Sequence, residues 1–140
     1  IFFNIKNLFK LQYEELKHQR EERRKCRKEK DFERQVKKYL MDQGCWYFKT
    51  WSNGIQAEGI PDLIACCNGY FLAVEVKAEN GHPSQLQLHK IQQIRKAHGI
   101  AIVLYPNQFE EFKELIHQLN MDLHYSATLA QDILFKRSMT

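Results

Sequence analysis

The spacing of apolar and polar positions along the chain first predicts a long N-terminal helix. Residues 13–43 contain no Pro or Gly and are crowded with charged side chains and Gln. From Phe32 to Leu40 apolar positions recur every three or four residues, which is typical of a helix that packs on a core. Asp31 lies at the change of pattern and can cap a separate helix, so the segment is expected to form either one long helix or two shorter ones. Gly44 is the expected stop.

The middle of the chain predicts three strands. The aromatic-rich stretch 45–52 is the first, and a polar, Gly-containing connection follows it. Asp62–Cys67 and Tyr70–Lys77 are apolar runs joined by Asn68-Gly69, a dipeptide that favours a two-residue hairpin turn. We therefore expect a meander of three antiparallel strands.

The second half of the chain predicts a helix, a strand and a last helix. The first of these helices runs from Ser84 to about His98, and the continuous apolar run 100–105 is typical of a buried strand. Asn107 and Glu110 have the spacing of a capping box for the last helix. The helical side chains expected to face the core are Leu88, Ile91, Ile94, Phe109, Phe112, Ile116 and Leu119.

The hairpin has a register that brings charged residues together. If Asn68-Gly69 forms the turn, Asp62 lies directly opposite Glu75, with Cβ atoms about 4.5–5.5 Å apart. The strand period of two then places Lys77 on the same face as Glu75. The other face of the hairpin is expected to be the core, through Leu63, Ala65, Leu72, Val74 and Val76.

Two opposed carboxylates on a buried sheet are unfavourable unless a cation compensates them. Lys77 offsets only one charge, whereas Mg²⁺ prefers one or two carboxylates together with waters and phosphate oxygens. The alternative is that Glu75 and Lys77 form an ordinary ion pair and Asp62 merely begins a strand. The predicted register favours a ligand site over this alternative.

Composition limits the class of protein. The 140 residues, 44% of them hydrophobic, suit one globular domain, and no apolar stretch is long enough to span a membrane. The N-terminus lacks the long apolar region of a signal peptide, so we expect an intracellular, cytoplasmic protein. A net charge of +4 permits an anionic partner. The cysteines show no C-x-x-C spacing, which favours reduced, packing residues: Cys26, Cys45, Cys66 and Cys67.

Three motifs in order resemble a known nuclease family. G-I-P-D at 59–62, E-V-K at 75–77 and S-x-x-Q at 84–87, followed by IRKAHGIAIVLYP, resemble the VRR-NUC (virus-type replication-repair nuclease) family of the PD-(D/E)xK superfamily, in its phage and bacterial stand-alone form. The similarity covers about residues 31–117. It implies an α/β fold with a restriction-endonuclease-like αβββαβ core, in which helices flank a mixed β-sheet.

The resemblance also implies the domain organisation. We expect a charged helical extension over 1–30, the nuclease domain over 31–120 and a tail over 121–140. The segment from Lys17 to Lys30 lies outside the family core, and its Lys and Arg outnumber its Glu. A DNA-contacting helix and a solvated or partner-binding helix are both consistent with this composition.

The resemblance assigns roles to particular side chains. Asp62 and Glu75, with the backbone carbonyl of Val76, would bind Mg²⁺ or Mn²⁺, and Lys77 would position the attacking water. Glu33, on the first core helix, would be a further catalytic residue and metal ligand.

Local chemistry leaves some of these roles open. Gln87 matches the family's helical Gln, but its spacing from Ser84 is also that of a capping box. Glu33 lies among many helical charges, where a solvated face is the default. Lys49 and His82 are each interpreted as plain surface. Trp46 and Trp51 are assigned to core packing rather than to stacking on bases.

These observations support a metal-dependent nuclease that hydrolyses DNA phosphodiester bonds, with a preference for branched, flap or junction DNA in replication, recombination or repair. The expected setting is a bacterial or phage-infected cell, and a homodimer is consistent with the superfamily. One alternative is a catalytically silent nucleic-acid-binding or assembly module with a nuclease-like fold. Another is a structural protein that uses its basic helix for protein contacts.

Overall fold

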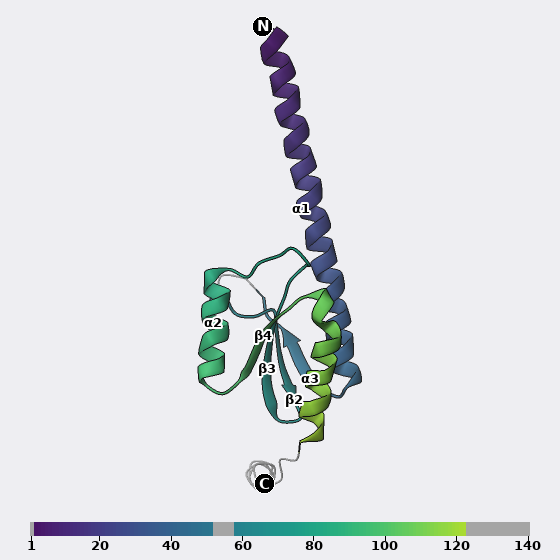
Figure 1. Cartoon of the computed structure of the whole chain (residues 1–140), viewed down its shortest axis with the longest axis vertical. Coiled ribbons are helices and arrows are strands. Elements are labelled where there is room, and N and C mark those ends of the chain that lie inside the picture. The colour runs from purple at the N-terminus through teal and green to yellow at the C-terminus, as the bar shows by residue number, and fades with distance from the viewer. Residues whose placement is uncertain (1, 52–57, 123–140) are drawn as a thin grey trace, which may run out of the picture.

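A computed structural model of the chain describes residues 2–51 and 58–122. The elements follow the predicted order of helix, three strands, helix, strand and helix (Figure 1). They are α1 (Phe2–Asp42), β1 (Trp46–Lys49), β2 (Leu63–Cys67), β3 (Tyr70–Val76), α2 (Gln85–Lys96), β4 (Ile100–Leu104), the 3-10 turn η1 (Pro106–Gln108) and α3 (Phe109–Met121). In the described part of the chain, no helix combines the length and the apolarity needed to cross a membrane.

The four strands form one mixed sheet in the order β1-β2-β3-β4. The first three make the expected antiparallel meander, and β4 returns parallel to β3 after α2. Cys67 pairs with Tyr70, so Asn68 and Gly69 form a two-residue turn, as predicted. Their φ angles of 50° and 85° are both positive, which a type I′ hairpin turn requires.

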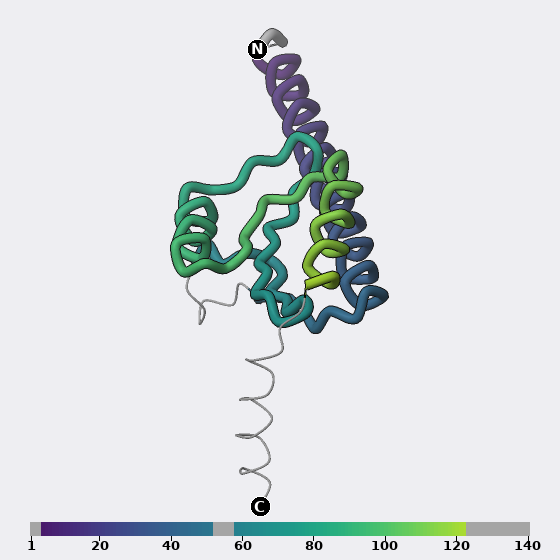
Figure 2. The backbone as a smooth tube through the Cα atoms, turned by 60° about the horizontal axis from the view of Figure 1, so that its bottom comes forward, coloured from purple at the N-terminus to yellow at the C-terminus, as the bar shows by residue number. Residues whose placement is uncertain are grey.

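Helices cover both faces of the sheet. Figures 1 and 2 show α1 and α3 side by side on one face and α2 on the other. The main core lies under α1 and α3, and the smaller one lies under α2, around Ile91. The main core buries Phe32, Val36, Leu40, Leu63, Ala65, Leu72, Val74, Val76, Phe112, Ile116 and Leu119, among others. The hairpin face that was expected to be core is therefore confirmed.

α1 is one helix that is longer than the sequence pattern indicates. It begins at Phe2 and runs unbroken past Asp31, whose carboxylate pairs with Arg34 at 2.6 Å instead of capping a new helix. The absence of Pro and Gly before Gly44 permits this continuity. Only the part from Phe32 onward packs on the core, and the rest projects beyond the sheet (Figure 1). Gly44, at φ 77°, ends the helix as expected.

Several expected core positions are wrong. Leu88 is 36% exposed, because α2 packs on the small residues of β3 and β4 mainly through Ile91. Trp46 and Trp51 are 65% and 67% exposed. Side chains alternate along β1, and it is Tyr47 that packs against the main core.

The predicted start of the last helix is also wrong. Asn107 lies inside η1, and the cap position of α3 is Gln108, which makes no side-chain capping bond. Pro106 begins the 3-10 turn, and this moves the start of α3 beyond Asn107. The cysteines are all free, as expected, and Cys45 and Cys67 are buried, but the packing role is wrong for Cys26 and Cys66, which are exposed.

Candidate functional site

The G-I-P-D segment is fixed at the end of the sheet by a close approach and two hydrogen bonds. Gly59 has φ 81°, and a Cβ there would lie 2.7 Å from the backbone of Leu86, so only glycine lets the segment pack on the first turn of α2. The Thr50 amide donates to the Asp62 carbonyl and its hydroxyl donates to the Pro61 carbonyl, both at 2.8 Å. The Asp62 side chain is thereby held just before β2.

Asp62 and Glu75 lie together at this end of the sheet. β2 begins at Leu63, which pairs with Val74, so Asp62 and Glu75 are the next residues in the same register. The amide of Val76 donates to Asp62 Oδ2 at 3.0 Å, which ties the aspartate to β3. The Asp62 charge acts on Glu75 strongly enough to raise its pKa.

Glu75 is the most deeply buried charged side chain of the site, at 1% exposure. Its Oε1 accepts from Lys77 Nζ at 3.1 Å and from Gln87 Nε2 at 2.6 Å. Its Oε2 is buried and has no hydrogen-bond partner among the described residues. Burial first, and the Asp62 charge second, raise the pKa of Glu75 to about 7 against the opposing effect of Lys77. The carboxyl is therefore partly protonated near neutral pH.

Lys77 stays protonated beside this carboxyl. Burial lowers the pKa of Lys77, but the hydrogen bond and charge of Glu75, with the charges of Glu29 and Asp62, outweigh burial and raise it. The site therefore combines a fixed ammonium with two carboxylates that it does not fully neutralise.

Gln87 makes the capping contact that its spacing from Ser84 predicts and also contacts Glu75. Its side-chain oxygen accepts a hydrogen bond from the backbone amide of Ser84 at 2.7 Å. The backbone amide of Gln87 donates to the Ser84 hydroxyl at 3.1 Å, which completes a capping box. Its Nε2 is then directed to Glu75. The helix cap thus orients the side chain that holds one oxygen of Glu75.

Glu33 lies in a different set of contacts. It is 7% exposed, so it does not belong to a solvated face, and it pairs with Lys49 at 2.8 Å and Lys37 at 3.5 Å. Within the described residues, neither a hydrogen bond nor an ion pair connects Glu33 to Asp62 or Glu75. Its assignment as a metal ligand stays a prediction. Lys49 is more than plain surface, because it is the partner of a buried carboxylate.

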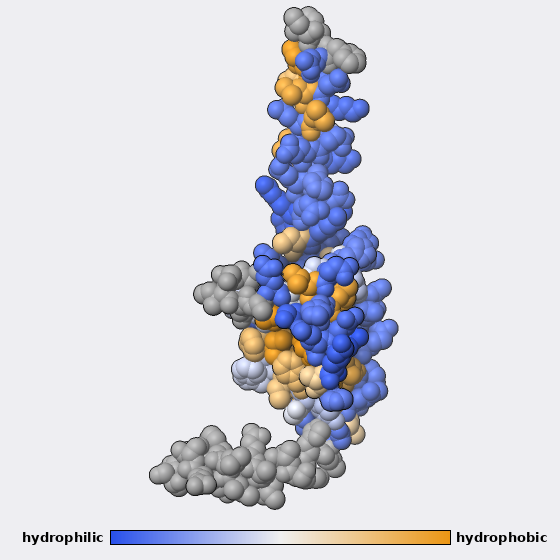
Figure 3. Space-filling view, turned by 90° about the vertical axis from the view of Figure 1, so that its left-hand side faces the viewer, coloured by the Kyte–Doolittle hydropathy of each residue, from blue (hydrophilic) through white to orange (hydrophobic). Residues whose placement is uncertain are grey.

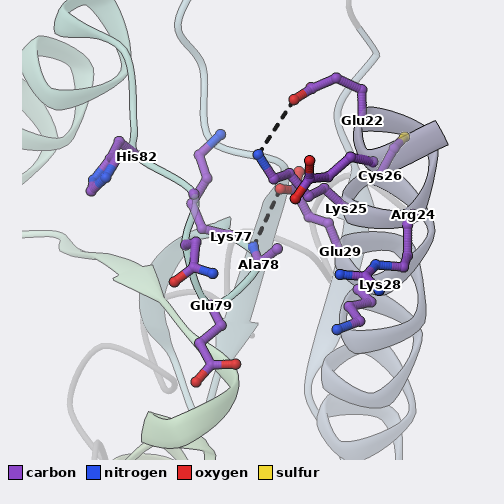
Figure 4. Close-up of a pocket in the computed structure, with 13 residues that line it drawn as sticks. Glu22, Arg24, Lys25, Cys26, Lys28, Glu29, Lys77, Ala78, Glu79 and His82 are labelled. Carbon is purple, nitrogen blue, oxygen red and sulfur yellow. Dashed lines mark hydrogen bonds and ion pairs between the residues drawn. The ribbon is translucent and has the colours of Figure 1, made fainter. Parts of the chain in front are cut away.

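The sequence interpretation missed Glu29. Its Oε2 accepts from the amide of Ala78 at 3.3 Å, next to Lys77, and its charge helps to raise the pKa of Lys77. A cavity of about 410 Å³ lies between this part of α1 and residues 77–82, with Lys77 and His82 in its wall (Figure 4). Glu29 is one of many charges on α1, so no feature of its spacing distinguished it.

The donor set fits a hard divalent cation. In the described ranges, no three His, Cys, Asp or Glu side chains are grouped as a metal site. Two carboxylates are present, however, and the unpartnered Oε2 of Glu75 is a buried acceptor that requires a cation or a donor. One or two carboxylates, completed by waters and phosphate oxygens, are what Mg²⁺ takes at phosphate-processing sites.

Comparison with known proteins identifies a family. Residues 24–106, more than half of the chain, match the family model described as archaeal Holliday junction resolvase (hjc). Searches of curated proteins and of solved structures gave no significant match. The matched region contains Asp62, Glu75, Lys77 and Gln87, together with the whole sheet. The chain therefore belongs to the archaeal Holliday junction resolvase family, a family of DNA nucleases in the PD-(D/E)xK superfamily expected from its motifs.

Proposed function

We propose that the protein is a metal-dependent nuclease that hydrolyses phosphodiester bonds in branched DNA, four-way junctions above all. The observation that carries the proposal is Glu75, a buried carboxylate beside Asp62 and Lys77 with one oxygen left without a partner. The family supports the substrate class, since its name is that of enzymes acting on Holliday junctions. Recombination, replication or repair of DNA is the corresponding process.

The proposal has a narrower part. The order G-I-P-D, E-V-K and S-x-x-Q resembles VRR-NUC nucleases, and we infer a relationship to them within the PD-(D/E)xK superfamily. We assign the nuclease unit to residues 31–120, with 1–30 as an extension and 121–140 as a tail. A homodimer would supply one such unit for each of two incisions.

The carboxylates are the metal ligands in this proposal. Asp62 and Glu75, with the backbone carbonyl of Val76, would hold Mg²⁺ or Mn²⁺, and Glu33 is a further candidate ligand. Such an ion would lower the pKa of a coordinated water and polarise the phosphoryl oxygen. Glu75 enters the complex without its proton, so binding competes with protonation near pH 7.

The remaining side chains of the site position the reacting groups and stabilise the charge that develops on the phosphate. Lys77 keeps its proton, orients the attacking water and offers a fixed positive charge to the phosphate as negative charge develops. Gln87 holds Oε1 of Glu75 and so leaves Oε2 directed to the ligand. Glu33 holds Lys49, which pairs across the sheet with Leu63, the residue after Asp62. Lys49 is thus a second cation at this end of the sheet.

The test is cleavage of linear, flapped and four-way DNA with Mg²⁺ by the wild-type chain and by Asp62→Ala. We expect the wild type to cut branched DNA and the variant to be at least 100-fold slower, on the order of the loss expected for an essential electrostatic group. Electrophoretic binding of the same DNA in EDTA serves as the folding and binding control. A wild type that binds but cuts nothing would identify a silent binding module, and an equally active variant would refute the assigned site.

A further inference from the structure

The positive charge of the chain is concentrated in the middle of α1. Residues 17–30 contain eight Lys and Arg and three Glu, a net charge of +5, whereas the whole chain has a net charge of +4. The rest of the protein is therefore slightly acidic. Figure 3 shows this part of α1 as mainly hydrophilic surface between the apolar positions nearer the N-terminus and the domain. Charge concentrated in this way favours an anionic partner.

Three of the four arginines of this segment gather on one side of the helix. At 100° per residue they fall within an arc of about 60°, on the side opposite the positions that face the core. The arginine face consists of Arg20, Arg23 and Arg27, whereas Arg24 lines the cavity beside Lys77. All three are exposed, and none makes a hydrogen bond or ion pair with a described residue. The face is therefore free to bind an anion.

The glutamates lie on the other side of the helix. Glu29 contacts Ala78 of the domain, and Glu22 pairs with Lys25 at 3.4 Å; both point toward the cavity that contains Lys77 (Figure 4). The acidic residues thus face the domain and leave the arginine face without negative charge. A helix that was merely solvated has no need for this segregation.

Self-association is a poor explanation of the arginine face. Arg20, Arg23 and Arg27 continue, at alternating spacings of three and four residues, the exposed line of Tyr13 and Leu16. In a coiled coil these positions form the apolar seam, and pairing two copies would stack arginine against arginine. The DNA backbone, with one negative charge per about 1.7 Å of helix axis, matches a row of guanidinium groups better.

The arginine face lies close to the candidate active site along α1, but on the other side of the helix. Glu29 fixes α1 beside Ala78 and Lys77, and the face begins at Arg27, two residues upstream. At 1.5 Å per residue it extends to Arg20, about 14 Å beyond Glu29. The Lys77 cavity and the arginine face therefore lie on opposite sides of one helix.

We propose that α1 lies between two arms of a branched DNA. The arm to be cut lies on the Lys77 side, and the arginine face binds the phosphate backbone of a second arm. One straight duplex cannot contact both sides of the helix, whereas two arms that diverge from a junction can. The inference rests on the proposed function for the identity of the DNA.

The experiment compares two variants of the full chain that lose the same charge. One carries Arg20→Ala, Arg23→Ala and Arg27→Ala, and the matched control carries Lys10→Ala, Lys90→Ala and Lys96→Ala. Alanine preserves the helix in each. Binding of a labelled four-way junction, and of a linear duplex with the sequence of one arm, is measured in EDTA from 50 to 200 mM salt.

For the junction, three lost phosphate contacts should reduce the slope of log K against log salt by about 2.7. The control and the linear duplex should change much less. An unchanged slope, or an equal change for the linear duplex, would overturn the inference. Binding to anionic lipid vesicles is measured with the same variants, and a loss of vesicle binding without a loss of junction binding would also overturn it. Because no cleavage takes place in EDTA, these results do not depend on whether the protein is a nuclease: if the wild type cuts junctions but the arginine variant has an unchanged salt slope, this inference alone is refuted.

Discussion

Replacing Glu75 by Gln should stabilise the metal-free protein increasingly as pH rises. In the folded chain the pKa of this carboxyl is raised from 4.5 to about 7, mainly by burial and then by the Asp62 charge. Below pH 4.5 the side chain is protonated in both states. Between the two values the unfolded state has released its proton while the folded state retains it, so the wild type loses stability until the pH passes about 7.

The size of this effect follows from linkage. One pKa unit corresponds to about 1.4 kcal/mol, so the interval between 4.5 and about 7 corresponds to a loss on the order of 3 kcal/mol. Gln cannot ionise, but it keeps an oxygen for Lys77 and Gln87. The difference in unfolding free energy between Glu75→Gln and the wild type should therefore grow by roughly 3 kcal/mol from pH 4.5 to pH 8.

Urea unfolding in EDTA at pH 4.5, 6, 7 and 8 measures this difference, because groups that titrate alike in both proteins cancel. Adding Mn²⁺ at pH 8 should remove most of this difference. An ion at 100 times its Kd stabilises the wild type by about 2.7 kcal/mol, and the variant should gain far less. A difference that stays flat with pH, or falls, would refute the raised pKa, and equal gains from Mn²⁺ would refute Glu75 as a ligand.

Two further predictions test how the site is held. Gln87→Ala should lower both stability and the cleavage rate, because the side chain caps α2 and holds Glu75, whereas Ser84→Ala should cost about 1 kcal/mol of stability and leave the rate nearly unchanged. Urea unfolding and single-turnover cleavage distinguish the two, and equal rate losses would contradict a separate role for Gln87. Gly59→Ala should cost about 2 kcal/mol or more, because its Cβ would overlap the Leu86 backbone, while Gly44→Ala, with open space around it, should cost about 1 kcal/mol. Similar losses at the two glycines would contradict the close approach of G-I-P-D to α2.

The hairpin could be predicted from sequence because its determinants are local. Asn68-Gly69 selects the turn, and the turn fixes the register that brings Asp62 to the level of Glu75. The period of two then separates the core face from the charged face. The capping box of α2 could also be predicted, because the spacing of Ser84 and Gln87 is visible in the sequence.

Other features depend on packing between distant elements and could not be predicted. The pairing of Glu33 with Lys49 joins a helix to a strand, and Glu29 reaches Ala78 across 49 positions of sequence. Neither contact has a signature in spacing. The length of α1 escaped prediction for a different reason: its N-terminal part packs on no core, so periodicity gives no boundary. Trp46 is exposed because alternation along β1 gives the core position to Tyr47.

The central claim is that a metal held by Asp62 and Glu75 hydrolyses the backbone of branched DNA. Its most direct test is single-turnover cleavage of a labelled four-way junction with Mg²⁺ at pH 8, by the wild type and by Glu75→Gln, after junction binding in EDTA has been shown equal for the two. We expect the wild type to incise the junction and Glu75→Gln to be roughly 10²–10³-fold slower. Incision at the same rate by both proteins, or binding without incision by the wild type, would contradict the claim.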